Sequence, residues 1–348
     1  NTTAPIVFNR THDVGYDITG INSVYLQHTA DSVLSGGTYP TIYVTPSGAY
    51  TTTMAGDVTV NGSLLIYNNY VNGLTTLDTS SSNYALTVNG NLTIGTLGIF
   101  PGKLKANDSS IVVTGNVHVD FNFIVFTNTI DADTSNWTVG GNWTISTSDS
   151  IPGVFTADTS TVTFNSGSTG KTIYSGGSSF YNIIFNNASG GWTLQEAMTV
   201  TNDFTVTNSD TTGSGVDLNG KAVNVTNDFS INGGEVTAGA STITIGGNWT
   251  NSGTFTYDTS TVILTGASVA LDTGGNGSTK RFYNLQLTTA GQTVTLTNQL
   301  AIQNVLTIGS TSGSKVTLTD GASNYTLYLY KNTTAPIVFN RTHDVGYD

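Results

Sequence analysis

Three pairs of acidic residues are the first candidates for chemistry. They are Asp131 with Asp133, Glu196 with Asp203, and Asp210 with Asp217. Carbohydrate-cleaving enzymes use paired carboxylates as acid and base, and two acids two residues apart share one face of a strand. The letters DADTSN around Asp133 are typical of a turn, however. We therefore expect these acids to shape turns, and we expect no enzyme.

Metal-ligand patterns are weak in this chain. The histidines are scattered: His12, His28, His118 and His343. None has the i, i+3 or i, i+4 spacing that binds zinc, so we expect no transition metal. Two Gly-rich loops, residues 213–220 and 272–278, do bring together Asp and Asn oxygens, which calcium prefers. Neither loop has EF-hand spacing. A plain turn is the favoured interpretation, and calcium stays open as the one candidate cofactor.

Asn-X-Ser/Thr sequons are candidates for glycan attachment in an exported protein. Asn142 and Asn248 both lie in the letters GNWT and are the first choices, followed by Asn61 and Asn324. The tryptophans next to two of these sequons suggest a platform for sugar stacking. Trp143, however, occupies a position that Leu92 and Phe204 fill in other copies of the same phrase. Core packing is therefore the predicted role of the tryptophans.

A short phrase recurs along the chain and predicts the elements that position these residues. It reads LTVNGNLTI at residues 86–94, IVVTGNVHV at 111–119, WTVGGNWTI at 137–145, MTVTNDFTV at 198–206 and VNVTNDFSI at 223–231. Apolar and polar residues alternate on both sides of a central Asn/Gly group. This pattern predicts a strand, a tight corner and a second strand, each strand with one buried face.

The corner asparagines are regularly spaced. They are Asn91, Asn116 and Asn142 in one stretch of the chain, and Asn202, Asn227 and Asn248 in another. The interval of about 21–26 residues indicates coils of a solenoid. A longer repeat of about 100 residues lies over it: FTADTSTVTF at residue 155 returns as FTYDTSTVIL at 255, and FYNIIF at 180 returns as FYNLQL at 282.

The first segment of the chain, NTTAPIVFNRTHDVGYD at positions 1–17, returns without a change at positions 332–348. A single coil buries too little apolar surface to fold alone, so coils need neighbours. Neither end offers an amphipathic helix or a charged cap. The sequence therefore predicts that residue 332 is equivalent to residue 1, so that one period spans positions 1–331. The predicted contact between copies is Ile6, Val7 and Phe8, and Ile337, Val338 and Phe339.

Composition excludes several classes of protein. Only 9% of the 348 residues are charged, and the net charge is −12. Nucleic-acid binding needs clustered Lys and Arg, of which there are 10 in all, so no nucleic-acid partner is expected. No apolar run approaches the length of a membrane span. The absence of cysteine removes disulfides and thiolate metal sites.

The letters LTVNGNLTIGTLG, VGGNWTISTS and FTADTSTVTFNSG resemble the repeats of large exported β-helix proteins of bacteria and archaea. These include autotransporter-like and filamentous-haemagglutinin-like surface proteins and giant repeat adhesins. The resemblance covers roughly positions 58–320. It implies a location at the cell surface and a structural or adhesive role, and it assigns no catalytic residue.

These observations give one set of expectations. The fold is an all-β parallel β-helix with coils of about 21–26 residues, stacked end to end. Residues 1–17 and 332–348 are the repeated segment, 18–57 an irregular β module or insertion, and 58–331 the coils, with duplicated blocks at about 140–245 and 246–320. The expected function is a structural unit of an extracellular filament, stalk or surface fibre. Its partner is itself, head to tail, as a covalent tandem or a homopolymer, and surface glycans are a further candidate. The alternative is a carbohydrate-binding or carbohydrate-cleaving β-helix.

Overall fold

The structure is a computed structural model. It describes residues 6–8, 22–68, 73–96, 100–122, 126–147, 151–309, 314–321, 323–330 and 337–339. The chain is all-β and forms stacked parallel coils, about 12 turns in the described residues, which confirms the predicted β-solenoid. It divides into two compact units, residues 1–166 with 171–181 and residues 167–170 with 182–348. Each unit is described by itself below.

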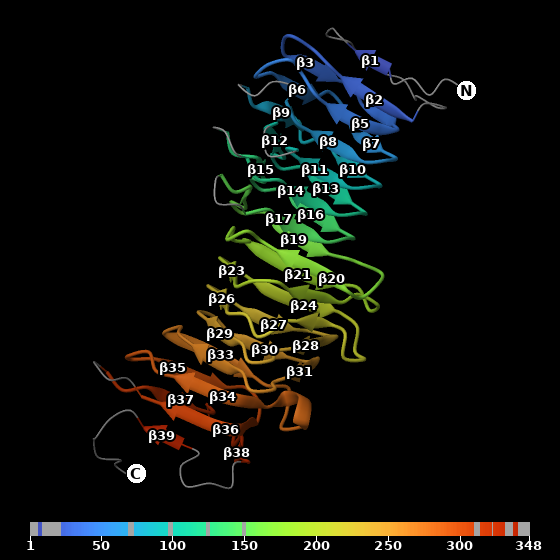
Figure 1. Cartoon of the computed structure of the whole chain (residues 1–348). Coiled ribbons are helices and arrows are strands. Elements are labelled where there is room, and N and C mark those ends of the chain that lie inside the picture. Colours follow the sequence, from blue (N-terminus) through green and yellow to red (C-terminus); the bar gives the residue numbers. More distant parts are fainter. Residues whose placement is uncertain are drawn as a thin grey trace. The chain divides into compact units, whose positions relative to one another are not determined.

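Unit 1 has three parallel sheets, which appear in blue to green in Figure 1. Sheet 1a contains β1 (Ile6–Phe8), β2 (Ser23–Leu26), β5 (Thr41–Val44), β8 (Leu64–Ile66), β11 (Leu92–Ile94), β14 (Val117–Val119), β17 (Trp143–Ile145) and β20 (Lys171–Tyr174). Sheet 2a contains β3 (Ser32–Leu34), β6 (Thr51–Met54), β9 (Thr75–Asp78), β12 (Gly102–Lys105), β15 (Thr129–Asp131) and β18 (Val154–Thr156). Sheet 3a contains β4 (Gly37–Tyr39), β7 (Val58–Val60), β10 (Leu86–Val88), β13 (Ser110–Val113), β16 (Asn136–Val139) and β19 (Thr161–Phe164).

Unit 2, yellow to red in Figure 1, also has three parallel sheets. Sheet 1b contains β22 (Trp192–Leu194), β25 (Val216–Asp217), β28 (Glu235–Thr237) and β31 (Thr254–Thr256). Sheet 2b contains β23 (Met198–Val200), β26 (Val223–Val225), β29 (Thr242–Ile245), β32 (Thr261–Leu264), β34 (Phe282–Leu287), β36 (Leu300–Ile308) and β38 (Leu327–Leu329), and β39 (Ile337–Phe339) also pairs with β36. Sheet 3b contains β21 (Asn182–Asn186), β24 (Phe204–Asn208), β27 (Phe229–Ile231), β30 (Trp249–Asn251), β33 (Ser268–Asp272), β35 (Thr293–Leu296) and β37 (Thr317–Thr319). The short 3-10 helix η1 spans Ser278–Lys280.

The strands follow directly from the recurring phrase. In the first phrase, Leu86 and Val88 of β10 and Leu92 and Ile94 of β11 are buried, and Thr93 between the latter two is not. The next coil repeats this register, with Leu92 opposite Val117 and Ile94 opposite Val119. Identical positions of successive coils therefore stack on one another and build a continuous core.

Coil length varies more than the sequence predicts. In unit 1 a short coil runs from Val24 to its register partner Ile42, and a long one runs from Trp143 to Ile173. In unit 2 a short coil runs from Val236 to Phe255, and a longer one from Trp192 to Val216. A coil tolerates extra residues because they enter the connections between strands, where no ladder or core position is displaced.

Residues 22–57, for which the sequence predicts an irregular module or an insertion, contribute β2 to β6 to the three sheets of unit 1. β2 pairs with β5, and β5 pairs with β8 of the following coil. Pro40 lies between β4 and β5, and Pro46 follows β5, so neither proline interrupts a ladder.

Candidate functional site: the coil corners and the end strands

One corner of unit 1 is held by a ladder of side-chain oxygens. The backbone N–H of Asn116 donates to Oδ1 of Asn91 at 2.8 Å, the N–H of Asn142 donates to Oδ1 of Asn116 at 2.7 Å, and the N–H of Thr172 donates to Oδ1 of Asn142 at 2.9 Å. Earlier coils continue the ladder with hydroxyls of Thr41 and Ser63. The spacing of the asparagines in the sequence therefore records hydrogen bonds between successive coils.

The ladder that the same sequence phrase forms in unit 2 uses aspartate. It precedes the strands of sheet 3b, whereas the ladder of unit 1 precedes the strands of sheet 1a. The N–H of Asp228 donates to Oδ1 of Asp203 at 3.1 Å, the N–H of Asn248 donates to Oδ1 of Asp228 at 2.7 Å, and the N–H of Ala270 donates to Oδ1 of Asn248 at 2.8 Å. The corner asparagines Asn202 and Asn227 each lie one residue before the ladder residue, Asp203 or Asp228. The ladder oxygen belongs to the residue directly before the buried Phe204, Phe229 or Trp249.

Close backbone approach explains the glycines of these corners. A Cβ on Gly141 would collide with the carbonyl oxygen of Gly115 and with Oδ1 of Asn116 on the coil before. A Cβ on Gly247 would likewise collide with Oδ1 of Asp228. Neither glycine has a positive φ. Glycine is required at these two positions because the backbones of successive coils are in contact. A left-handed backbone conformation is not the reason.

A second recurring corner was not predicted from the sequence. It is a four-residue turn in which the N–H of the fourth residue donates to the carbonyl of the first, for example Ser135 to Ala132 at 3.0 Å. The second residue has a positive φ, 49° at Asp133 and 43° at Asp258, and Asn and Asp tolerate this conformation. The signal was present as a recurring pattern of Ala, then Asn or Asp, then any residue, then Ser, at residues 106–109, 132–135 and 157–160.

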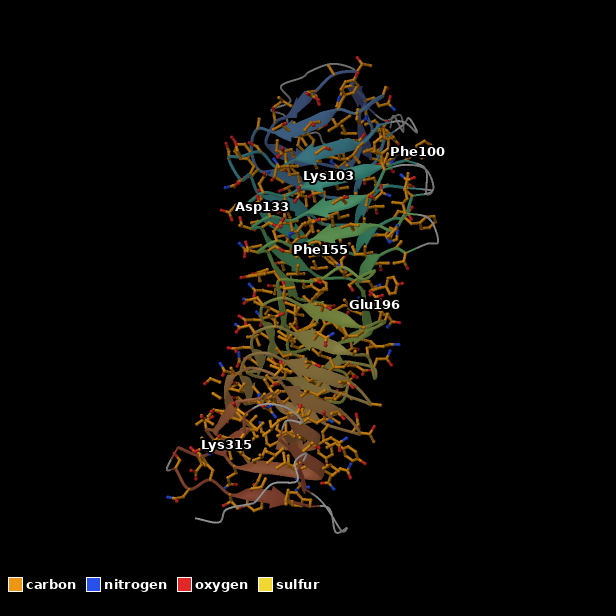
Figure 2. The ribbon with its side chains drawn as sticks, turned by 90° about the vertical axis from the view of Figure 1, so that its left-hand side faces the viewer. Phe100, Lys103, Asp133, Phe155, Glu196 and Lys315 are labelled. Carbon is orange, nitrogen blue, oxygen red and sulfur yellow. The ribbon has the colours of Figure 1, made fainter. Side chains whose placement is uncertain are left out.

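The candidate acids serve these turns and the strand surfaces. Figure 2 shows Asp133 at the rim of unit 1 and Lys103 on β12. Asp131 forms an ion pair with Lys103 at 2.9 Å, and the neighbouring Lys105 binds Asp78 at 3.2 Å. Burial tends to raise the pKa of Asp78, but its hydrogen bonds, the one from Asn107 first, lower that pKa below its usual value.

In unit 2 the acids close local turns or corners. Oδ1 of Asp210 accepts hydrogen bonds from the backbone and hydroxyl of Thr212, which lower the pKa of Asp210. Oδ1 of Asp217 accepts from the N–H of Asn219 at 2.7 Å. Asp203 belongs to the corner ladder, and Figure 2 shows Glu196 at the rim of this unit. These hydrogen bonds and ion pairs engage the acids in turns, corners and strand surfaces.

The loops proposed for calcium are built in the same way. Oδ1 of Asp272 accepts from the N–H of Gly274 at 2.8 Å, as Asp217 does in the other loop. Across the described residues, no group of three or more His, Cys, Asp or Glu side chains could hold a metal ion. His28 is buried, with Nδ1 2.6 Å from the carbonyl of Ala30 and Nε2 2.8 Å from Oγ1 of Thr52. Burial lowers the pKa of His28.

The tryptophans lie in the core, as predicted. Trp137, Trp143, Trp192 and Trp249 are at most 1% exposed. In unit 1, Trp143 packs edge-on against Phe155, which is labelled in Figure 2. In unit 2, Phe204, Phe229 and Trp249 form a face-to-face stack with ring centroids 4.5 and 5.0 Å apart. None of the four tryptophans offers an exposed ring face for a sugar.

Aromatic rings do reach the outer surface at other positions. In unit 1, Tyr25 and Tyr43 stack at 4.3 Å on neighbouring strands of sheet 1a. In unit 2, the guanidinium of Arg281 lies 3.7 Å above the ring of Tyr330, which is 39% exposed, and its Nη1 donates to Gln303. Tyr330, Arg281 and Gln303 together form the outer tyrosine–arginine cluster of unit 2.

The sequons differ in exposure. Asn61 and Asn324 are exposed, whereas Asn142 and Asn248 are half-buried and each accepts a ladder hydrogen bond through Oδ1. An attached glycan needs solvent around the amide nitrogen. Asn61 and Asn324 are therefore better candidates for glycan attachment than Asn142 and Asn248, the first choices from the sequence.

Both copies of the repeated segment contribute a strand with the same three residues. β1 (Ile6–Phe8) pairs in parallel with β2, and β39 (Ile337–Phe339) pairs in parallel with β36. The remaining residues of the two segments lie outside the described ranges. These two strands are the predicted contact between copies.

Comparison with known proteins adds no relative. Within the described ranges, no helix is both long enough and apolar enough to cross a membrane. No protein-family model, no curated protein and no solved structure matches this chain. The chain is therefore described by its fold, a parallel β-solenoid consistent with β-helix repeat proteins.

Proposed function

We propose that this chain is one period of an extracellular filament, stalk or surface fibre, in which successive periods continue the β-solenoid head to tail. The observation that carries this proposal is that both copies of the repeated segment supply a parallel strand, β1 on β2 and β39 on β36. A segment that extends a ladder at each occurrence is suited to joining one period to the next. The identity of the two copies favours covalent tandem repetition over separate subunits.

The role is mechanical and adhesive. Parallel ladders, corner hydrogen bonds and a continuous core resist bending, so the polymer would act as a rigid spacer. The candidate acids are engaged in turns, corners and ion pairs, which supports a non-enzymatic role. A location at the cell surface is supported by the likeness of the repeats to exported β-helix proteins, and glycans at Asn61 and Asn324 would suit that location.

Denaturing electrophoresis beside electron microscopy of the native material tests this proposal. We expect long fibres in the micrographs. After boiling in strong detergent, the protein should migrate far above 36.3 kDa, because the periods are covalently continuous. If the protein of the fibres migrates as a band near 36.3 kDa after boiling, the fibre is a non-covalent homopolymer and not a covalent tandem. Compact monomers without fibres would contradict the proposal.

A second candidate, carbohydrate binding, is favoured by the outer tyrosine–arginine cluster. Tyr330 carries an exposed ring with the Arg281 guanidinium above its face, and aromatic rings, guanidinium groups and amides such as that of Gln303 bind sugars by stacking and hydrogen bonds. A glycan array probed with the chain and with its Tyr330→Ala variant tests it. Binding that the variant loses would support this candidate, and equal signals from both proteins would contradict it.

A further inference from the structure

The two end strands pair on opposite sides of the same three residues. β1 precedes its partner β2 in the stack, and β39 follows its partner β36. Coils advance in one direction, so β1 pairs through the edge that faces later coils, and β39 pairs through the edge that faces earlier coils. Within the described residues, the other edge of each strand has no strand partner. One strand of this sequence could therefore satisfy both pairings at once.

The registers of the two pairings agree. Ile6 and Phe8 align with the buried Val24 and Leu26, and Val7 aligns with Tyr25. At the other end, Ile337 aligns with the buried Leu306 and Val338 with Thr307. Phe339 aligns with the half-buried Ile308. In both cases the first and third residues of Ile-Val-Phe align with apolar residues, and the middle residue aligns with a residue that is not buried. A slip of one residue would reverse this alternation.

The neighbouring strands follow the same pattern. On the side of the first period, the triplets aligned with Ile-Val-Phe are Leu285-Gln286-Leu287 of β34 and Leu306-Thr307-Ile308 of β36. On the side of the next period, they are Val24-Tyr25-Leu26 of β2 and Ile42-Tyr43-Val44 of β5. Each triplet has apolar residues first and third. Ile-Val-Phe fits between the two rows without a change of period.

Unit 2 also has apolar residues in its last described strands that are only half-buried. Leu318 of β37 and Leu327 and Leu329 of β38 are only half-buried. Their register partners one coil earlier, Val294, Leu300 and Ile302, are buried. The last described coil thus carries the core pattern without the next layer that buries it, and a further coil of the same kind would supply that layer.

We infer that a single copy of the repeated segment is a strand shared by two periods, in the order β36, Ile-Val-Phe, β2. The partner of the segment is therefore a second copy of this chain, in a defined register, and sheet 2b of one period continues as sheet 1a of the next. This inference rests on the proposed filament and adds to it the pairing at the joint.

A two-period chain tests the pairing. It consists of the full chain followed directly by residues 18–348 of a second copy, so that one repeated segment lies between the periods. The natural sequence has no cysteine, so introduced pairs report contacts without background. Cα atoms on adjacent strands are about 4.8 Å apart, within disulfide range, and those two strands apart are about 9.6 Å apart, beyond it.

We expect two cysteine pairs to cross-link on mild oxidation: Thr307→Cys with Val338→Cys, and Val338→Cys with Tyr25→Cys of the second copy. The matched control, Thr307→Cys with Tyr25→Cys of the second copy, spans two strands and should not cross-link. In the same chain, amide exchange at residues 337–339 should slow by about tenfold or more relative to the single chain, because both edges are paired.

The outcomes separate this inference from the proposed function. Cross-linking to Thr307 without cross-linking to the second copy's Tyr25 would overturn the shared strand, and so would cross-linking of the control pair. Unchanged amide exchange would contradict it independently. Fibres seen in native material would then leave the filament standing with a different joint.

Discussion

The two units close the corner of the same sequence phrase with different chemistry. In unit 1 the oxygens that receive the next coil's N–H groups belong to neutral residues, Asn91, Asn116 and Asn142. In unit 2 they belong mainly to Asp203 and Asp228. The core beside the corner changes too, from Leu92, Val117 and Trp143 to a face-to-face stack of three aromatic rings.

This difference shows what the corner requires. It needs an acceptor oxygen on a short side chain, directly before the first core residue of the strand, and Thr41 and Ser63 satisfy that need as well. Charge is not required. The acidic version makes charge-assisted hydrogen bonds, which are stronger, but it places like charges on successive coils.

The largest loss of stability is expected in the aromatic core of unit 2. Phe229→Ala removes the middle ring of the stack in unit 2 and should lower the free energy of unfolding by about 3–5 kcal/mol. Denaturant unfolding followed by amide exchange in each unit measures this loss and locates it. Ser230→Ala, on the outer face of the same strand, is the control and should change stability little. A loss below about 1 kcal/mol for Phe229→Ala would show that the stack is not a core element.

The ladders themselves should differ in strength. Asp228→Ala removes a charged acceptor and should cost about 1.5–3 kcal/mol, whereas Asn116→Ala, which removes a neutral acceptor, should cost about 0.5–1.5 kcal/mol. The conservative Asp228→Asn converts the corner of unit 2 to the chemistry of unit 1 and should retain most of the stability. Equal losses of stability for the two alanine variants would show that the charged and neutral acceptors are equivalent at these corners.

Acid should weaken unit 1 through His28. Burial lowers the folded-state pKa of His28 below the ordinary value of 6.5, so the unfolded chain binds the proton more readily. This contribution is complete above pH 6.5 and is lost as the pH falls through the folded-state pKa. The described part of unit 2 contains no histidine.

Unfolding midpoints of unit 1 at pH 8 and pH 5.5 measure this loss. His28→Gln should reduce the difference between the two midpoints. A pH dependence that survives His28→Gln would assign the effect to other groups.

The smallest effect is expected at the outer ion pairs of unit 1. Lys103 and Asp131 are both partly exposed, 27% and 28%, so Asp131→Asn should change stability by no more than about 1 kcal/mol. Added salt should reduce even that difference. A larger loss of stability, or the loss of an activity on a carbohydrate in Asp131→Asn, would make Asp131 a candidate functional acid again.

Local sequence patterns predict most of this fold. Alternation around the corner identifies β10 with β11 and β16 with β17, because one face of each strand is buried. The sequence pattern does not say which of two neighbouring residues supplies the ladder oxygen, as at Asn227 and Asp228. Either side chain could accept a hydrogen bond, and only the position relative to Phe229 decides between them.

The roles of the end strands could not be derived from their letters alone. Ile-Val-Phe predicts a strand, but the partner of a strand depends on which coil lies above or below it. The buried environment of His28 was likewise invisible in the sequence, since Ala30 and Thr52 reach it from a turn and from the next coil.

Cryo-electron microscopy of the native fibre, at a resolution that separates strands, tests the central claim most directly. We expect a ladder with a spacing of about 4.8 Å that runs without interruption from β36 through a single Ile-Val-Phe strand to β2 of the next period. A gap in the ladder at this point, or two copies of the segment at each joint, would contradict it.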